Sequence, residues 1–401
     1  MNLFKSTLII ILSLMLTNCT NNDEKLKARA NELAQKFIIT DGHIDLPWRL
    51  HKNGYEDISV RTPGGDFDYV RAKQGGLDAP FMSIYVPATY QVTGGAKEMA
   101  LDLINSVKRI TIDHPDKFEM AYSISDVERI FTEGKIALPM GMENGAPIEG
   151  DLDNIQFFFD EGIRYITLTH SEDNDICDSS YNLGERTHKG LSDFGKEVVL
   201  EMNRVGIMVD ISHVSDDAFY QIMDVTQVPA IASHSSARHF TPGFERNMSD
   251  DMIKRLAENG GVIQINFGSS FVTQESQDKR KKNSEAVSAF AKENNLESDD
   301  PRVKEFAKKV AIDNPVFCDV TDVADHFDHV VKLVGIDHVA FGSDYDGVGD
   351  TLPYGLKDAS TFPNLIYHLL KRGYSEKDIE KICYKNIWRV WKATEEFAKL
   401  N

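Results

Sequence analysis

Short apolar segments rich in β-branched residues alternate along this chain with longer segments in which apolar residues recur every three or four positions. The first pattern is typical of buried strands and the second of amphipathic helices, and their alternation predicts parallel strand pairing through βαβ crossovers. The expected strands are Phe37–His43, Phe81–Val86, Ile136–Met142, Ile163–Thr169, Gly206–Ile211, Val228–Ala232, Gly261–Phe267 and His338–Phe341. Eight strands in a body of this length favour a single (β/α)8 TIM-type barrel over an open doubly wound sheet.

The segments between the strands predict helices, several of which begin at a serine that could cap the first turn. Expected helices include 24–36, Ala96–Ile112, Ser125–Phe131, Ser192–Val205, Ser215–Val225 and Ser249–Glu258. The segment from about 271 to 314 interrupts the alternation because it begins with a long stretch of charged and polar residues. We expect a helical insertion there, either a lid over the mouth of the barrel or a solvated surface insertion.

The first residues have a different character. Lys5 precedes an apolar run that is too short to cross a bilayer as a helix and is typical of a signal peptide. The run ends in Leu16-Thr17-Asn18-Cys19, which resembles the lipobox of bacterial lipoproteins. The resemblance implies a signal peptide over 1–18, a lipidated Cys19 with a tether over 19–25, and a barrel domain over 26–401. The alternative is that an ordinary signal peptidase cleaves nearby and Cys19 is incidental.

A lipidated Cys19 would hold the protein in the bacterial cell envelope through its lipid alone. Thr20 follows Cys19 where an Asp would favour the inner membrane, so the outer membrane is the expected location.

The formal net charge of −19, from 63 acidic and 44 basic residues, argues against a nucleic acid partner. The other cysteines are Cys177, Cys318 and Cys383, and none forms a CxxC pair. At most one disulfide is open to them, and buried unreactive thiols are favoured over a metal site.

Six of the eight expected strands end in or next to a histidine or an acidic residue. Singly, each such residue is more often a structural histidine or a surface carboxylate, but the ends of parallel barrel strands converge on the face that carries active sites. Imidazole and carboxylate ligands suit zinc or a similar metal. The pattern therefore predicts a metal centre built from three imidazoles and two or three carboxylates at this face, where His43, Asp45, Glu143, His170, His213, His234 and Asp344 are expected to converge.

The motifs around these residues, in their order, resemble the membrane (renal-type) dipeptidase family of amidohydrolase-like barrels, from about Phe37 to Trp391. They are Asp-Gly-His-Ile-Asp-Leu-Pro at 41–47, Gly-Met-Glu-Asn-Gly at 141–145, Leu-Thr-His at 168–170, Asp-Ile-Ser-His at 210–213, Ser-His-Ser-Ser-Ala at 233–237 and Gly-Ser-Asp-Tyr-Asp-Gly at 342–347. The resemblance implies a zinc-dependent hydrolase that cleaves the peptide bond of dipeptides, including those with a D-residue on the C-terminal side. The family also suggests a homodimer.

The resemblance also implies a role for each residue. His43 and Asp45 would bind one Zn²⁺ ion, and His213 and His234 a second, with Glu143 bridging the pair. The two ions would activate a water for attack on the peptide carbonyl. Ser212, Ser235 and Ser236 are expected to orient the ligand histidines.

Three further residues complete the expected chemistry. His170 would stabilise the oxyanion that develops on the carbonyl oxygen, and Asp344 would transfer the proton. Arg246 would bind the free carboxylate of the substrate, because its planar guanidinium pairs with a carboxylate through two hydrogen bonds. The alternative for Arg246 is a capping role or a surface salt bridge.

Two other functions are compatible with the same motifs. One is another amidohydrolase reaction, on N-acyl amino acids, lactones or phosphotriesters, and the other is a lipoprotein that only binds nutrients. A carboxylate-binding Arg246 disfavours phosphotriesters, and a complete set of metal ligands disfavours binding alone. Residues 79–85 and 171–178 depart from the family's more usual sequences, so substrate preference does not transfer directly.

Overall fold

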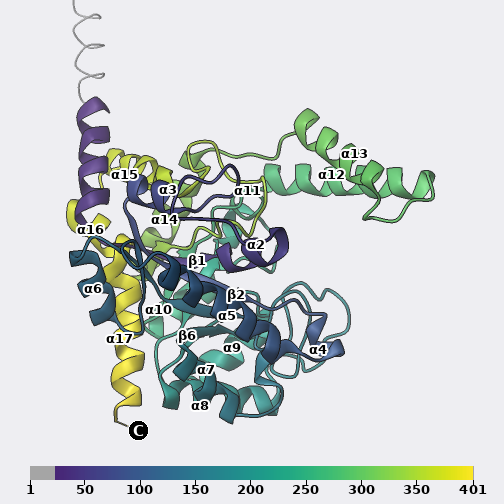
Figure 1. Cartoon of the computed structure of the whole chain (residues 1–401). Coiled ribbons are helices and arrows are strands. Elements are labelled where there is room, and N and C mark those ends of the chain that lie inside the picture. Colours follow the sequence, from purple (N-terminus) through teal and green to yellow (C-terminus); the bar gives the residue numbers. More distant parts are fainter. Residues whose placement is uncertain (1–22, 401) are drawn as a thin grey trace, which may run out of the picture.

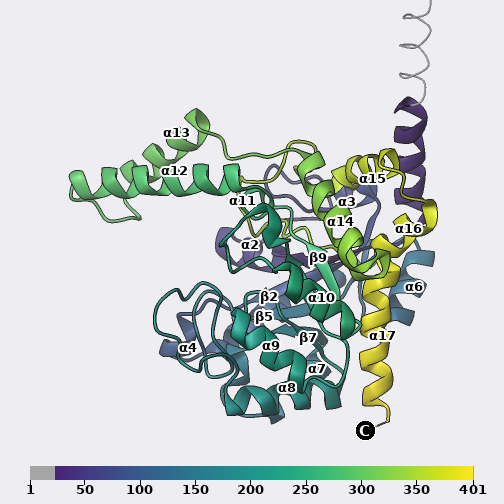
Figure 2. The same ribbon diagram turned by 180° about the vertical axis from the view of Figure 1, so that it is seen from behind.

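The computed structural model describes residues 23–400, in which eight parallel strands form a closed barrel surrounded by helices (Figures 1 and 2). Each barrel strand pairs with the next along the chain, and β10 closes the ring by pairing with β1. The barrel strands are β1 (Ile39–Ile44), β2 (Leu77–Tyr85), β5 (Met140–Glu143), β6 (Ile163–Thr167), β7 (Met208–Asp210), β8 (Ile231–Ser235), β9 (Val262–Ile265) and β10 (Val339–Phe341). The predicted (β/α)8 barrel is confirmed.

One expected strand is divided in two. The segment predicted as Ile136–Met142 forms β4 (Ile136–Leu138), which pairs with β3 (Phe118–Met120) outside the barrel, and then β5 inside it. Pro139 separates the two and has no backbone N–H to donate, while its carbonyl accepts a hydrogen bond from Met82 at 2.8 Å. The prediction of a continuous strand was wrong because the chain changes pairing partner at this proline.

Serine side chains cap helices largely where expected. The side chains of Ser192, Ser215 and Ser249 each accept a hydrogen bond from the backbone N–H three residues later. The cap expected at Ser125 was wrong, because Ser123 has the extended backbone of an N-cap and accepts from Asp126 N, which places Ser125 inside the first turn.

The helices fill the connections between strands and the outer face of the barrel. A helix over 23–36, expected over 24–36, precedes β1 in the chain and includes the last residues of the expected tether. The other α-helices are α2 (Leu46–Asn53), α3 (Tyr69–Gly75), α4 (Tyr90–Thr93), α5 (Ala96–Asp113), α6 (Ile124–Thr132), α7 (Asp153–Glu161), α8 (Asp193–Val205), α9 (Asp216–Val225), α10 (Asp250–Glu258), α11 (Ser269–Val272), α12 (Gln274–Glu293), α13 (Pro301–Asp313), α14 (Val320–Val334), α15 (Phe362–Lys371), α16 (Glu376–Glu380) and α17 (Asn386–Ala398). Short 3₁₀ or π turns are η1 (Ala146–Ile148), η2 (Arg238–Phe240), η3 (Ile336–His338), η4 (Ala359–Thr361) and η5 (Lys381–Lys385).

The C-terminal helix α17 packs against residues near the beginnings of the barrel strands. Trp391 is fully buried, with its ring 5.2 Å from that of Phe81 on β2, and Trp388 donates from its indole nitrogen to Thr40 Oγ1 on β1. These aromatic rings belong to one apolar cluster with Tyr165 inside the barrel. The packing closes the amino-terminal end of the barrel and leaves the carboxyl-terminal end available for a site.

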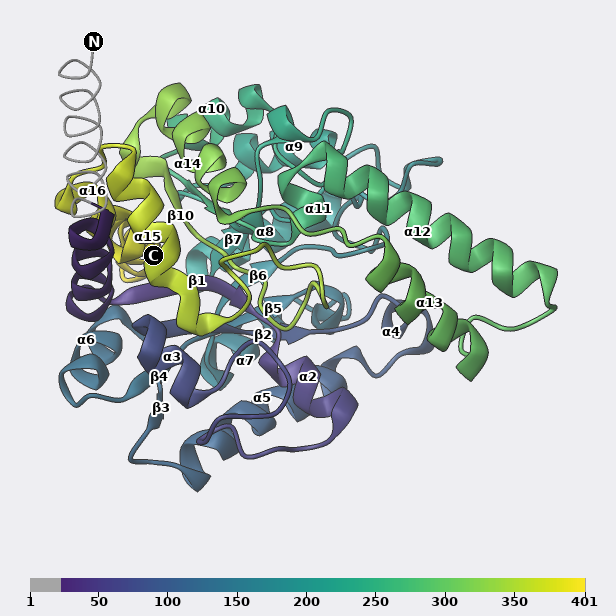
Figure 3. The same ribbon diagram turned by 90° about the horizontal axis from the view of Figure 1, so that it is seen from above.

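The insertion forms a helical hairpin of α12 and α13 that projects away from the barrel, as Figure 3 shows from above. The rings of Phe290 and Phe306 stack at 4.2 Å between the two helices, and most other side chains of the hairpin are exposed or half-buried. Only its base borders the mouth of the barrel, through Arg280. Of the two alternatives left open by the sequence, this arrangement resembles a solvated surface insertion more than a lid.

Two further sequence predictions concern the cysteines and the anchor. Cys177, Cys318 and Cys383 are buried free thiols, as favoured. Within residues 23–400, none of the helices combines the length and the apolar character needed to cross a bilayer. The expected signal peptide and Cys19 lie outside the described residues.

Candidate metal centre

The predicted ligands lie together at the carboxyl-terminal end of the barrel. Most of them end or follow a strand, as expected, and the two exceptions, His43 in β1 and His234 in β8, are each the next-to-last residue of their strand. Their side-chain ligand atoms form three overlapping groups, each with all atoms within 4.8 Å of one another. The groups are His43, Glu143 and His234; Glu143, His170 and His213; and His43, Asp45 and Asp344.

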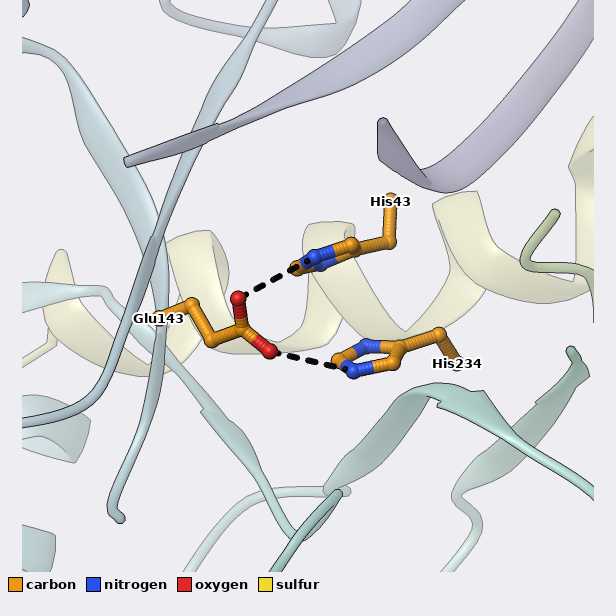
Figure 4. Close-up of side chains that lie close together, drawn as sticks. All are labelled: His43, Glu143 and His234. Atoms are coloured by element: carbon orange, nitrogen blue, oxygen red, sulfur yellow. Dashed lines mark ion pairs between the residues drawn. The ribbon is translucent and has the colours of Figure 1, made fainter. Parts of the chain in front are cut away.

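Glu143 lies at the centre of these groups, and Figure 4 shows its carboxylate between the rings of His43 and His234. Its Oε2 lies 3.4 Å from His43 Nε2, which in turn lies 3.4 Å from Asp45 Oδ2. Its Oε1 lies 3.1 Å from His213 Nε2 and 3.2 Å from His234 Nε2. One oxygen of Glu143 therefore faces His43, which is itself next to Asp45, and the other oxygen faces His213 and His234.

Neighbouring polar groups hold two of the histidine rings so that Nε2 points into this cluster. Tyr165 donates its hydroxyl proton to Gly42 O at 3.0 Å, so the same hydroxyl accepts from His43 Nδ1 at 2.8 Å. That bond leaves the lone pair of His43 Nε2 free to bind a cation.

The ring of His234 is held through a serine. Ser233 Oγ donates to the carboxylate of Asp210 at 2.6 Å and contacts His234 Nδ1 at 2.7 Å. The expected ring contacts from Ser212, Ser235 and Ser236 were wrong, because those hydroxyls bond instead to one another, to backbone groups or to Arg246. Their positions next to the histidines in sequence do not bring them to the imidazole nitrogens.

The electrostatics of the cluster favour a bound cation. Burial, followed by the charge of Arg246, lowers the pKa of His213 well below its usual value, which keeps the ring neutral as a ligand must be. Burial would raise the pKa of Glu143, but the imidazoles of His43 and His170 hold it well below its usual range. His43 Nε2 and Asp45 Oδ1 are buried and have no hydrogen-bond partner within residues 23–400. Buried groups without partners are costly, and divalent metal ions would satisfy these atoms.

Two of the candidate residues have backbone conformations that are unusual for residues with a side chain. His213 has φ of 71° and Asp344 has φ of 61°. Such left-handed conformations cost free energy, and they recur at functional sites where the surrounding structure enforces them. At Asp344 the conformation is supported by its N–H, which donates to His43 O at 3.1 Å, and by Asn266, whose amide donates to Asp344 Oδ2 at 2.7 Å.

The cluster opens into a cleft of about 290 Å³. Its walls include the aromatic rings of Trp48, Tyr85, Tyr181 and Phe271, and Asp344 and His170 border it. This volume is at the small end of the range for ligand pockets, so the cleft suits a small molecule rather than a polypeptide.

Arg246 also lines the cleft and is 3% exposed. Its guanidinium donates to Ser235 Oγ and to His234 O, both at 2.8 Å, and contacts His213 Nε2 at 3.0 Å. Among the described residues it has no carboxylate within ion-pair distance, and its Nε has no hydrogen-bond partner. It is therefore neither a capping residue nor a surface salt bridge, the alternatives considered from the sequence.

Sequence reasoning missed several residues that shape the site. Tyr165, Ser233 and Asp210 orient the ligand rings, and Arg280 reaches the cleft from the insertion. In the loop over 171–178, which departs from the family's usual sequence, Asp173 lies outside the cleft, and its carboxylate accepts hydrogen bonds from Ser179 N and Asn182 Nδ2 just after that loop. No periodicity or motif in a single sequence signals such contacts, because they depend on which loops meet in space.

A (β/α)8 barrel whose strand ends gather imidazoles and carboxylates in a small cleft defines a metallohydrolase of the amidohydrolase-like kind. The family model for membrane dipeptidase (peptidase family M19) matches residues 27–401. The chain belongs to this family, and it is a hydrolase of the metallopeptidase class.

Similar proteins support this assignment. The chain is 30% identical to mouse dipeptidase 3 over 382 residues, which cover 94% of this chain and 68% of the mouse protein. It is 26% identical to the probable dipeptidase PvdM from Pseudomonas aeruginosa, with a TM-score of 0.80 over 94% of this chain and all of the other. A metallopeptidase from Rhodobacter sphaeroides, solved with a phosphinate mimic of the dipeptide L-Ala-D-Ala, shares the fold at 24% identity and a TM-score of 0.73 over 89% of this chain and 99% of the other.

Proposed function

We propose that this protein is a zinc-dependent dipeptidase that selects substrates by their free C-terminal carboxylate. The observation that carries the proposal is the buried guanidinium of Arg246, which faces the cleft beside the metal cluster without a carboxylate partner among the described residues. Burying an unpaired charge is costly, so the arrangement makes sense where a ligand supplies the missing carboxylate. A small cleft then limits the rest of the ligand to about one further residue.

Two zinc ions would be held by the four outer ligands and the shared carboxylate. His43, whose Nε2 also lies 3.4 Å from Asp45 Oδ2, faces Oε2 of Glu143, while His213 and His234 face Oε1, and this arrangement supports Glu143 as the bridge. Neutral imidazoles and carboxylates are the ligands that zinc prefers. Bound divalent ions would polarise the peptide carbonyl and lower the pKa of water at the site.

The remaining steps fall to side chains of this chain. Burial lowers the pKa of His170, so its ring is neutral. The N–H of the neutral ring can donate a hydrogen bond to the carbonyl oxygen as negative charge develops there. Burial raises the pKa of Asp344 well above its usual value, so this carboxyl readily holds the proton that the attacking water releases. Asp344 would then return that proton to the amine nitrogen as the carbon–nitrogen bond breaks.

We further propose that the enzyme accepts either stereoisomer of the residue on the C-terminal side of the cleaved bond. We include D-residues there because the Rhodobacter sphaeroides neighbour was solved with a mimic of L-Ala-D-Ala. This dipeptide is therefore the first substrate to assay, beside L-Ala-L-Ala.

The test combines metal removal with altered substrates. Chelation should abolish dipeptide hydrolysis and added Zn²⁺ should restore it, whereas activity that is indifferent to the chelator contradicts the metal mechanism. C-terminally amidated dipeptides should be cleaved far more slowly than free dipeptides, because they cannot pair with Arg246. N-acetyl amino acids keep the carboxylate but lack the free amino group, so faster turnover of these compounds would identify a different amidohydrolase instead.

We also propose that Cys19 carries a lipid that anchors the enzyme in the cell envelope, most simply in the outer membrane. The support is the sequence Leu16-Thr17-Asn18-Cys19 after a short apolar run. The wild-type protein should fractionate with membranes and the Cys19→Ser variant should not, while equal fractionation of the two would contradict the anchor. The homodimer stays a prediction.

A further inference from the structure

A second cluster of ligand-type side chains lies outside the catalytic cleft. His239, Asp250 and His329 bring one ligand atom each within 4.8 Å of the others. His329 Nε2 lies 2.7 Å from Asp250 Oδ1, and the rings of His239 and His329 stack at 4.3 Å with an angle of 19° between their planes. Within residues 23–400, it is the only such group that shares no member with the cleft.

The positions of these residues along the chain matter more than their number. His239 lies in η2, just after β8, and Asp250 is the first residue of α10. The nine intervening residues of the loop 241–249 include Arg246. His329 belongs to α14, which packs against α10. The cluster thus joins both ends of the loop that carries Arg246 to a third, separate helix.

The same helix supports this loop at a second point. His326, one turn before His329, accepts a hydrogen bond from Ala237 N at 3.0 Å through Nδ1 and contacts Val272 O at 2.9 Å through Nε2. The ring of Phe240 packs against both His326 and His329. His326 therefore already holds the start of the loop, whereas His329 presents its Nε2 to Asp250 at the end of the loop.

We propose that His239, Asp250 and His329 form a structural site for a divalent metal ion of the zinc type, distinct from the catalytic pair. Two imidazoles and one carboxylate are a suitable protein ligand set for such an ion, with water in the remaining position because the cluster is open to solvent on the side of His239. The ion would tie His239 and Asp250 together and so restrain the loop between them. By restraining the loop it would position Arg246 for the substrate carboxylate.

The ion would act on the loop by lowering its conformational freedom before substrate binds. A segment that is already ordered loses less entropy when its side chain engages a ligand. The effect should therefore be on substrate affinity rather than on the rate of the chemical step. The simpler alternative is a hydrogen bond between His329 and Asp250 without any metal.

Zinc counting tests the site directly. Apoprotein is equilibrated with buffered Zn²⁺, and bound zinc is measured for wild type, His239→Ala and His329→Ala. The matched control is His114→Ala, because His114 Nε2 also lies 3.1 Å from a carboxylate, Asp57, but belongs to no group of three. We expect the control to match wild type and both cluster variants to hold one zinc ion fewer per chain. Equal zinc in wild type and the cluster variants would overturn the proposal, as would the same loss in His114→Ala.

Hydrogen exchange gives a readout that does not depend on activity. Zinc should slow amide exchange across 241–249 in wild type and in His114→Ala, but not in His239→Ala. The side chain of His239 is exposed, so its removal should leave the fold intact. Zinc-induced protection that persists in His239→Ala contradicts the proposal. If the dipeptidase assignment were wrong, zinc count and loop protection would still report on this site.

Kinetics then connect the site to catalysis. His239→Ala should raise KM for free dipeptides a few-fold and leave kcat near the wild-type value, because Arg246 is less well positioned but the reacting groups are intact. A fall in kcat at unchanged KM would contradict a role through Arg246.

Discussion

Asp210 and Glu143 occupy equivalent places in the barrel, since each is the last residue of its strand and each is buried. The two carboxylates nevertheless have very different surroundings. Oδ1 of Asp210 accepts from the backbone N–H groups of Ser212 at 3.0 Å and Ser233 at 2.8 Å, and Oδ2 accepts from the hydroxyls of Ser233 and Thr167. Glu143 instead faces histidine Nε2 atoms on both of its oxygens, and the Ser83 hydroxyl donates to Oε2 only at the long distance of 3.4 Å.

The difference shows that burial at a strand end does not by itself identify a metal ligand. A buried carboxylate that is surrounded by N–H and O–H donors is satisfied within the protein. A buried carboxylate that is surrounded by other acceptors requires a cation or protons to be stable. Asp210 thus supports the site through Ser233 and His234, and Glu143 belongs to the site itself.

Exchanging each carboxylate for its amide gives the largest expected effect. Glu143→Gln should lower kcat/KM on the order of 10³-fold or more, because it removes a negative charge shared by both candidate metal positions. Asp210→Asn should instead lower zinc affinity by about 10- to 100-fold, since it disturbs a residue that orients His234 only through Ser233. Zinc titration and steady-state kinetics on both variants measure these effects. Equal losses of zinc affinity and of kcat/KM in the two variants would contradict the distinction between the two carboxylates.

The proposed proton-transfer role of Asp344 can be distinguished from the role of the candidate metal ligands. Asp344→Asn should retain both zinc ions and lose about 10²- to 10⁴-fold in kcat, because the amide cannot accept the proton of the attacking water. The Asn266 amide that donates to Asp344 Oδ2 can still pair with an amide oxygen, so the fold around it should survive. Near-normal turnover, or zinc loss equal to that of Glu143→Gln, would each contradict the assigned role.

The two arginines of the cleft allow a smaller and more specific comparison. Arg246→Ala should raise KM for free dipeptides by roughly 10- to 100-fold, corresponding to about 1.5–3 kcal/mol for the lost charged hydrogen bonds. Arg280→Ala should change KM much less, because Arg280 is exposed and donates to Ser270 Oγ at 2.9 Å at the cleft mouth. Neither variant should alter the slow hydrolysis of amidated dipeptides, and an equal effect of Arg246→Ala on both substrate types argues against carboxylate binding.

The sequence predicts the barrel and most of the cluster for one physical reason. Strand periodicity determines which residues end the strands, and closure of a parallel barrel brings those ends together. Hence His43, Glu143 and His213 could be assigned to one site without coordinates. Family motifs added Arg246, whose burial beside the cluster no local pattern predicts.

What the sequence did not predict depends on contacts between segments far apart in the chain. Tyr165 reaches His43 across 122 positions, and its strand pattern alone marks it only as a buried aromatic residue. The division of the expected third strand at Pro139 depends on which strands are available as partners. Ser123 caps the helix rather than Ser125 because Ser123 has the extended backbone angles of an N-cap. The sequence does not show which of two serines only two positions apart adopts those angles.

Asp78 gives the smallest expected effect and extends the comparison to the closed end of the barrel. It lies near the start of β2 and is buried, with Ile39 N at 3.4 Å and Lys73 Nζ at 3.8 Å as its partners. Burial raises the pKa of Asp78 from 3.8 to about 7. Unlike Asp210, Asp78 has few hydrogen-bond donors around its carboxylate. Unlike Glu143, it belongs to no candidate metal group among the described residues.

The sign of the pH effect follows from this raised pKa. Between about pH 4 and 7 the folded state holds a proton on Asp78 that the unfolded state has released, so this residue's contribution to stability falls as pH rises through that range. Asp78→Asn removes the titration, so the stability of the variant relative to wild type should increase by about 1–3 kcal/mol from pH 5 to pH 8 and level off above about 7. Urea unfolding of both proteins at several pH values measures the difference. A stability gap that stays constant with pH would show that Asp78 is ionised in the folded state throughout, and that its two weak partners satisfy it as fully as four donors satisfy Asp210.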